Sequence, residues 1–383
     1  CSSNRALANV TVPLTVEALA SGLSNASEVA RLRSFAQALR DAYGPNALSP
    51  SFDWGLRVFM EPRAPRKPAY TTLPLAIRLG EGTYEHIMFR NGWAPDSTLV
   101  TILAGDHFTD HQHFDKGHFL IYRRGGLAVD SGVYDQMYKP DGHWNEYASR
   151  TLAHNCLLVY DLEQTFPKGC TNDGGQNVLR GKQHHADWST YLAHYKKEGL
   201  DTAEVLNYDY DERNQYGYLR CNLSTAYSNK VSHYDRQFVY LPAPDLLVVF
   251  DRISAARPDY PKRWLLHFQD QPVTERRDTG ATLTTLKRRG QLNLGARTIT
   301  YDGALFVHTL LPAAHGVTVV GGPGHEFSNP FTGLNYPPSK PGLIAEVREP
   351  GAWRIEVAPT RPCADDQFLH ALQIADGSVA QPV

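Results

Sequence analysis

Histidine and aspartate are concentrated in one short stretch of the sequence, GDHFTDHQHFDKGHFLIYRRGGLAVDSG, at positions 105–132. His111 and His113 stand two positions apart, so they point to the same face of a strand or of its entry loop. If HFLIYRRGGLAVD forms a hairpin, Asp130 lies at the end of the return strand. Such a set can bind zinc when one more nitrogen or oxygen donor joins it, and His154, which opens the apolar run in TLAHNCLLVYD, is the obvious supplier.

The alternative is that these histidines are surface residues or hydrogen-bonded core residues, and composition alone does not decide between the two. The adjacent His184 and His185 would point to opposite sides of a strand, so we expect them to be surface or loop residues.

The composition indicates a globular protein with a sizeable core, because 42% of the 383 residues are hydrophobic and 11% are aromatic. Charge is nearly balanced, with 38 Lys plus Arg against 40 Asp plus Glu, which gives no support to a nucleic-acid or membrane-surface partner. No apolar run approaches the roughly 20 residues that span a bilayer. The five cysteines are scattered without CxxC spacing, so neither a thiolate zinc site nor a dense disulfide framework is indicated.

Two kinds of sequence pattern predict the elements that position the candidate residues. Helical spacing of apolar residues from Val16 to Tyr43, interrupted by a turn at Ser24 to Ser27, predicts two helices. Short runs rich in Val, Leu, Phe and Tyr, divided by Gly, Pro and Asp, follow and are typical of antiparallel strands. VYLPAPDLLVVFD reads as a hairpin with a four-residue turn.

The predicted fold class is therefore mainly β, an antiparallel two-layer β-sandwich with an additional C-terminal β region. We expect a short helical segment at 1–52, the sandwich with its zinc site at 53–275, and a C-terminal β-sheet region at 276–383 that extends or caps the sandwich.

Several separate motifs in a fixed order resemble one known family. They are the histidine-rich run through GVY, then YASRTLAHNCLLVYD, NDGGQ, VVFDRI and RWLLHFQDQP. Together they resemble the β-sheet portion of the heparinase II/III-like polysaccharide lyases, most closely heparinase II, over residues 73–272.

The resemblance implies a role for individual residues. It makes His113, Asp130 and His154 the ligands of Zn²⁺, and His111 a catalytic residue that faces the substrate. A tyrosine of the intervening loop also lines the cleft; local alignment favours Tyr138, with Tyr134 and Tyr147 as alternatives. The full predicted set is catalytic His111 and Tyr138; substrate-binding Tyr134, Tyr147, Arg150 and Asn172; and metal-binding His113, Asp130 and His154.

The implied chemistry is β-elimination on a uronic-acid polysaccharide. The proton beside the uronate carboxylate is removed and the 4-linked oxygen leaves, so the site must stabilise charge on the carboxylate and supply a base and an acid. Histidine and tyrosine suit the proton transfers. Because elimination needs no attacking water, we expect zinc to order the cleft wall, and its removal to loosen the loop from Asp130 to His154.

The family's usual architecture places a helical toroid before the sandwich, and the toroid carries the principal catalytic tyrosine. Only about fifty residues precede the β region here, so we expect the toroid to be missing from this chain or to lie on a separate polypeptide, and the helical segment to be its tail. A reduced relative without a toroid is the alternative.

The expected partner is an acidic polysaccharide, with heparin or heparan sulfate favoured and alginate or another uronan as alternatives. A non-catalytic carbohydrate-binding module and a zinc-dependent hydrolase are the competing functions. The resemblance also implies a homodimer. We expect a periplasmic, cell-surface lipoprotein or secreted bacterial location, and the opening CSSN would suit a lipoprotein cysteine at Cys1.

Overall fold

A computed structural model describes residues 25–43, 69–107, 112–136, 139–167, 170–179, 188–213, 215–294, 297–340, 342–343 and 349–382. The chain forms two compact units: Cys1–Leu75 with Gly92–Ala94, and Ala76–Asn91 with Pro95–Val383. No helix within these described ranges is long and apolar enough to cross a membrane.

The first unit contains helix α3 (Ala26–Tyr43) and the 3₁₀ turn η1 (Ala69–Thr72). Asn25 caps α3, because its side-chain oxygen accepts a hydrogen bond from the backbone N–H of Ser27 at 2.9 Å. The second of the two predicted helices is therefore confirmed, and it begins at the predicted turn. The first predicted helix lies outside the described residues.

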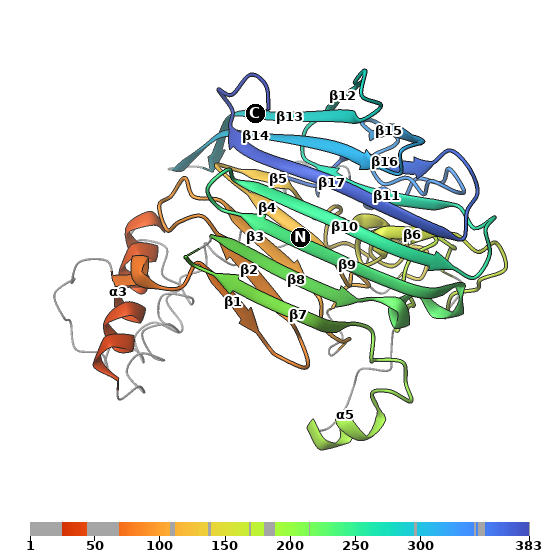
Figure 1. The fold of residues 1–383 in the computed structure, drawn as a ribbon, viewed down its shortest axis with the longest axis horizontal. Coiled ribbons are helices and arrows are strands. Elements are labelled where there is room, and N and C mark those ends of the chain that lie inside the picture. Colours follow the sequence, from red (N-terminus) through yellow and green to blue (C-terminus); the bar gives the residue numbers. More distant parts are fainter. Residues whose placement is uncertain are drawn as a thin grey trace. The chain divides into compact units, whose positions relative to one another are not determined.

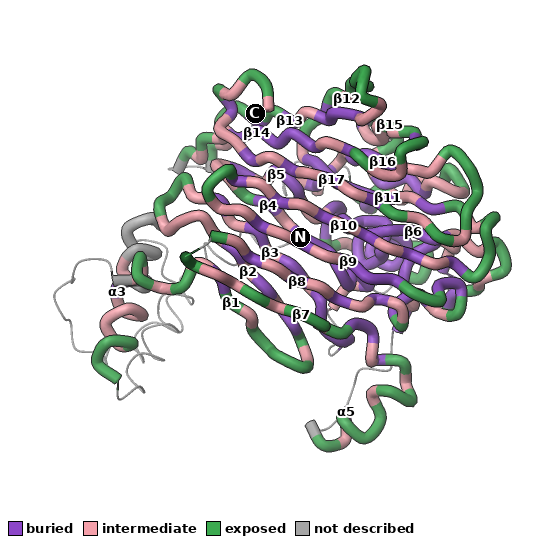
Figure 2. Tube along the Cα trace, in the orientation of Figure 1, coloured by how far each residue is buried: buried purple, intermediate pink, exposed green. Residues whose placement is uncertain are grey.

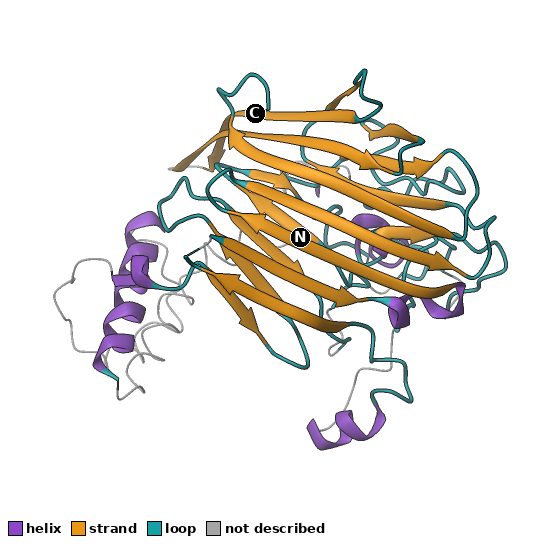
Figure 3. Cartoon of the chain, in the orientation of Figure 1, coloured by secondary structure: helices purple, strands orange, loops and turns teal. Residues whose placement is uncertain are grey.

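The second unit consists mainly of antiparallel strands, as predicted (Figures 1 and 3). Its short helical elements are η2 (Trp144–Ala148, a π-helical turn), η3 (Thr151–Ala153), α5 (Trp188–His194) and η5 (Ser224–Lys230). Its strands are β1 (Ala76–Leu79), β2 (His86–Arg90), β3 (Leu99–Leu103), β4 (Phe119–Tyr122), β5 (Gly126–Ala128), β6 (Leu157–Val159), β7 (Glu204–Asp211), β8 (Tyr216–Asn222), β9 (Val231–Leu241), β10 (Leu246–Ala255), β11 (Lys262–Phe268), β12 (Val273–Arg276), β13 (Thr282–Leu294), β14 (Arg297–Leu311), β15 (His315–Gly321), β16 (Trp353–Pro359) and β17 (Asp365–Asp376).

These strands form three sheets within the described ranges. The order is β1-β2-β3-β4-β5 in a five-stranded sheet, β12-β13-β14-β17-β10-β9-β8-β7 in an eight-stranded sheet, and β15-β16-β11-β6 in a four-stranded sheet. Burial alternates along several strands, as in β10, so these strands turn one row of side chains inward (Figure 2).

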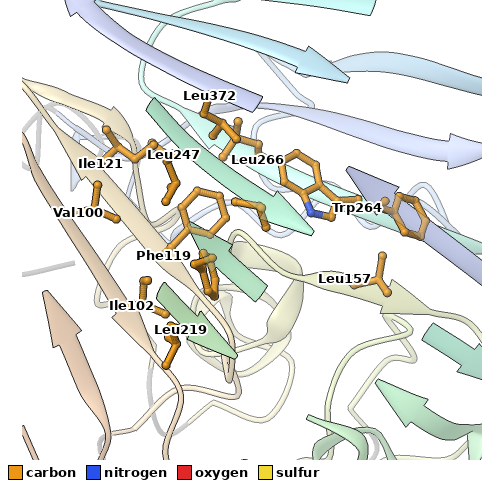
Figure 4. Packing of buried hydrophobic residues seen from close by; sticks show 14 of the residues in the cluster. Val100, Ile102, Phe119, Ile121, Leu157, Leu219, Leu247, Trp264, Leu266 and Leu372 are labelled. Atoms are coloured by element: carbon orange, nitrogen blue, oxygen red, sulfur yellow. The ribbon is translucent and has the colours of Figure 1, made fainter. Parts of the chain in front are cut away.

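One hydrophobic core joins side chains from all three sheets. Phe119 and Val100 come from the five-stranded sheet, Leu247 and Leu372 from the eight-stranded sheet, and Trp264 from the four-stranded sheet, and all five are buried (Figure 4). The eight-stranded sheet therefore forms one layer and the two smaller sheets share the other. Burying each such side chain stabilises the fold by roughly 1.5–3 kcal/mol.

Both hairpins considered in the sequence are present, the first next to the candidate residues and the second away from them in the sequence. β4 pairs with β5 across the Arg123–Gly125 turn, and β9 pairs with β10 across residues 242–245, where Asp245 adopts φ 51°. The strands beyond residue 276 extend the sandwich, because β13, β14 and β17 lie in the eight-stranded sheet, and β15 and β16 in the four-stranded sheet. The predicted boundary at 275/276 thus falls within continuous sheets.

Candidate metal centre

His113 lies in the loop that leads into β4, not on a strand. The loop is fixed to the segment that carries the other candidate ligands, because the Phe114 N–H donates to the Ser149 carbonyl at 3.0 Å and the Thr151 hydroxyl donates to the Phe114 carbonyl at 2.6 Å. Gln176 also holds the loop: its side-chain oxygen accepts from the Lys116 N–H at 2.9 Å. These bonds place His113 beside the segment that ends at His154.

Asp130 and His154 enter the site from two neighbouring chain segments. Asp130 follows β5, and His154 follows the 3₁₀ turn η3 and precedes β6. The backbone N–H of Ser131 donates to the Ala153 carbonyl at 3.0 Å, so the residues next to both ligands are joined directly. The loop between the two ligands is consequently closed at its base.

The structure brings the three predicted metal ligands together. One ligand atom from each of His113, Asp130 and His154 lies within 4.8 Å of the other two. The His154 Nδ1 is 2.5 Å from Asp130 Oδ1, and the His113 Nδ1 is 3.9 Å from Asp130 Oδ2. The side chain of His154 is fully buried, whereas those of His113 and Asp130 remain partly exposed.

The protonation of these groups suits a cation. Burial and the neighbouring His154 lower the pKa of His113 to about 4, so its imidazole is neutral at pH 7. Burial favours the neutral carboxyl of Asp130, but the charge of His154 outweighs burial and holds the pKa of Asp130 well below its usual value. Burial likewise opposes the charged form of His154, and Asp130 reverses this and raises the pKa of His154. A metal ion and a proton would therefore compete for His154.

Two imidazole nitrogens and one carboxylate oxygen form a donor set that zinc favours. A second observation fits this group: the Nε2 of His154 is buried, and no described residue forms a hydrogen bond with it. The residues therefore fit the predicted Zn²⁺, whose presence remains a prediction.

His118 lies beside this cluster, with its ring centroid 5.0 Å from that of His154. Its Nδ1 accepts a hydrogen bond from the Asn155 N–H at 2.9 Å. A neutral imidazole that accepts at Nδ1 carries its proton on Nε2, which therefore has no lone pair for a metal. His118 is consequently a structural histidine in this conformation.

Two aromatic side chains, Trp144 and Tyr134, lie next to the candidate ligands. The Trp144 ring lies edge-on to His113 with centroids 5.0 Å apart, and edge-on to Tyr134 with centroids 4.7 Å apart. Tyr134 is 48% exposed, and its substrate-binding role stays a prediction. His111 and Tyr138, the predicted catalytic residues, lie outside the described residues. Trp144 was missed in the sequence because its separation from His113 gave no local signal.

Two predicted substrate-binding residues are buried instead. Tyr147 has no exposed surface, and its hydroxyl lies 2.9 Å from the Ser131 hydroxyl. Arg150 also has no exposed surface, and it forms an ion pair with Asp173 at 2.5 Å. Both residues therefore hold the loop together within this chain, and their substrate-binding roles stay predictions.

The polar atoms of the Asn172 side chain form hydrogen bonds with nearby backbone groups. Its amide donates to the carbonyls of Asp161 at 2.7 Å and Gln164 at 3.2 Å, and its side-chain oxygen accepts from the Gly174 N–H at 2.9 Å. The NDGGQ run therefore forms a hydrogen-bonded turn. The substrate-binding role of Asn172 remains a prediction.

The fold and the site define a class: an antiparallel β-sandwich protein with a cluster of two histidines and one aspartate suited to a metal ion. The sequence profile described as Heparinase II/III-like, C-terminal, matches residues 84–307, more than half of the chain. The chain therefore belongs to this family, as the resemblance implied. No curated protein sequence matches it significantly.

Several solved structures are similar to this chain. A heparinase III gene product is 12% identical, with a TM-score of 0.48, and the match covers 79% of this chain and 37% of that one. The heparan sulfate lyase HepC from Pedobacter heparinus is 13% identical, with a TM-score of 0.49, and the match covers 92% of this chain and 43% of that one. This chain thus spans less than half the length of either structure.

Proposed function

We propose that this protein provides the β-sandwich part of a polysaccharide lyase that cleaves a uronic-acid-containing chain by β-elimination. Heparin or heparan sulfate is the favoured substrate, and alginate or another uronan is the alternative. The observation that carries the proposal is the convergence of His113, Asp130 and His154 beside the exposed Tyr134, in a chain of the heparinase II/III-like family.

Each residue has a separate part in the proposed reaction. His113, Asp130 and His154 would hold Zn²⁺, which would supply a fixed positive charge that orders the cleft wall. His111 and Tyr138 would move protons at the uronate, and Tyr134 would pack against a sugar ring. Because the removed proton is weakly acidic, the site must also neutralise the uronate carboxylate as charge develops there.

We further propose that a helical toroid outside this chain completes the active site, as in the family's usual architecture. An extracellular polyanion as substrate supports a periplasmic, surface-attached or secreted bacterial location, and a homodimer is the proposed assembly. The function of the chain alone is then to provide one wall of the cleft.

The test is incubation of the chain, alone and in a form extended upstream of Cys1, with heparin, heparan sulfate and alginate. Elimination creates a conjugated double bond, so we expect ultraviolet absorbance to rise with the extended form on at least one uronan. New reducing ends without that absorbance would indicate a hydrolase, and binding without either product would indicate a carbohydrate-binding module. Both of these results would overturn the proposal.

A matched pair of variants tests the metal ligands in the same assay. Asp130→Asn removes a charged donor from the cluster, and we expect loss of zinc binding and at least a tenfold fall in product formation. Asp141→Asn is the control, because Asp141 lies in the same loop with its side chain 78% exposed. Equal behaviour of the two variants would contradict a zinc role for Asp130.

A further inference from the structure

Trp144 holds a fixed position next to the candidate metal centre. It begins the π-helical turn η2 and is only 7% exposed. Its backbone N–H donates to the Asp135 carbonyl at 3.1 Å, and its carbonyl accepts from the Ser149 N–H at 3.1 Å and the Ser149 hydroxyl at 2.7 Å. The backbone is thus held on both sides, which gives the indole a defined location. π-Helical turns are rare in proteins, and those that occur are often found at functional sites.

The indole contacts two residues of different kinds. One is His113, a candidate ligand, with an interplanar angle of 79°, and the other is Tyr134, the exposed aromatic residue, with an angle of 64°. Both are edge-to-face contacts, in which the positive edge of one ring meets the negative face of the other. Trp144 therefore joins the metal centre to the exposed surface.

The orientation of the His113 ring depends on contacts of this kind. A metal-binding histidine generally donates its second ring N–H to a carboxylate or carbonyl, and this bond fixes the orientation of the ring. Among the described residues, none forms a hydrogen bond with the His113 ring; its polar neighbour is Asp130 at 3.9 Å, itself a candidate ligand. In the described part of the chain the ring contacts of His113 are Trp144 and His154, and this packing orients the imidazole.

We propose that Trp144 is a positioning residue for the metal centre: its indole, packed edge-to-face against His113, replaces the hydrogen bond that usually orients a ligating histidine. This inference rests on the proposed zinc site and goes beyond it, because it assigns metal affinity to an apolar contact. The aromatic ring, and not the indole N–H, carries the effect, since no described residue accepts a hydrogen bond from that N–H.

Three variants of the full chain separate these contributions. Trp144→Leu removes the aromatic ring, Trp144→Phe keeps a ring and removes the N–H, and Trp93→Leu is the control. Trp93 is suitable because it makes a comparable edge-to-face contact, with Tyr70 at 6.2 Å, and belongs to the first unit of the chain. Zinc affinity is measured by competition with a chromophoric chelator, without any substrate.

We expect Trp144→Leu to weaken zinc binding by about tenfold or more, within the range known for residues that orient metal ligands. Trp144→Phe and Trp93→Leu should bind zinc as the unaltered protein does. Unchanged affinity in Trp144→Leu, or an equal loss in Trp144→Phe, would overturn the inference.

A second measurement keeps the inference testable if Trp144→Leu fails to fold. Co²⁺ quenches the emission of a nearby indole, so titration of the unaltered protein should reduce tryptophan fluorescence. Trp144→Phe should bind Co²⁺ but lack that quenching, and quenching that persists would contradict the contact. A protein that binds neither Zn²⁺ nor Co²⁺ would overturn the zinc site together with this inference, whereas normal binding in every variant would overturn the inference alone.

Discussion

Lys230 is a buried lysine whose amine holds the NDGGQ turn. Its ammonium donates to the Gln164 side-chain oxygen at 2.6 Å and to the Gly175 carbonyl at 2.7 Å, and the residue is 1% exposed. Burial lowers its pKa to about 7; Asp173 opposes this shift and Arg150 adds to it. The same Asp173 forms an ion pair with Arg150, and its charge also favours the protonated form of Lys230.

This lysine predicts a pH dependence of stability. Because the folded pKa is about 7 and the ordinary value is 10.5, the unfolded chain binds one more proton between these pH values. The contribution of Lys230 to the free energy of unfolding should therefore rise with pH, by about 1.4 kcal/mol per unit for one proton. Urea denaturation from pH 7 to 9 should show this slope in the unaltered protein and not in Lys230→Met.

The control is Lys139→Met, because the Lys139 side chain is 55% exposed. It should keep the slope of the unaltered protein. An identical slope in Lys230→Met and the unaltered protein would show that the Lys230 pKa is not lowered by folding.

Single residues differ in how far the sequence could predict them. Spacing and the hairpin could bring the histidine pair and Asp130 to one end of the strands, but the resemblance to the family was needed to single out His113, Asp130 and His154. Tyr147 and Arg150 stand in the same motifs but are buried, because their partners Ser131 and Asp173 come from other segments. No local pattern encodes those pairings.

At the scale of elements, the segment before β16 braces the segment after β5. The Gly132 N–H donates to the Pro350 carbonyl at 2.8 Å, and the Ser131 hydroxyl donates to the Gly351 carbonyl at 2.8 Å. Gly351 has φ 63°, and a Cβ there would lie 2.6 Å from the Asp130 carbonyl oxygen. Glycine is thus required at this position both by conformation and by the close approach to a candidate ligand.

We expect Gly351→Ala to displace the Asp130 segment and to weaken zinc binding as well as stability. Gly333→Ala is a matched control: Gly333 has φ 72°, so the conformational cost is comparable, but nothing lies within 4 Å of the added carbon. Chelator competition and urea denaturation of both variants separate the two effects. If Gly351→Ala binds zinc as Gly333→Ala does, the brace does not position Asp130.

The hairpins could be predicted because turn residues and apolar runs are neighbours in the sequence, as in β9 and β10. The order of the eight-stranded sheet could not. β17 lies between β10 and β14, although it is the last strand of the chain, because its apolar face completes the core there. Long-range pairing of this kind depends on packing between distant segments, so it cannot be predicted from strand propensity.

At the scale of the whole molecule, the candidate metal centre and the main hydrophobic core are made of different residues. Residues of all three sheets close the core without any of the three ligands. The centre instead closes the loop from Asp130 to His154, next to the Ser131 to Ala153 backbone hydrogen bond. A metal ion would cross-link the two ends of that loop and reduce the entropy of its open states.

Zinc should therefore stabilise the molecule globally and protect this loop locally. Excess zinc at about 100 times its dissociation constant should raise the free energy of unfolding by about 2.7 kcal/mol, because it binds only the folded state. Chelation should speed amide exchange at Ser131, Val133 and Trp144, whose N–H groups bond within the loop, and leave the β13–β14 hairpin unchanged. Asp130→Asn should show neither effect. Uniform exchange changes in loop and hairpin would mean that zinc acts on the whole fold, and the centre would then be part of the structural core.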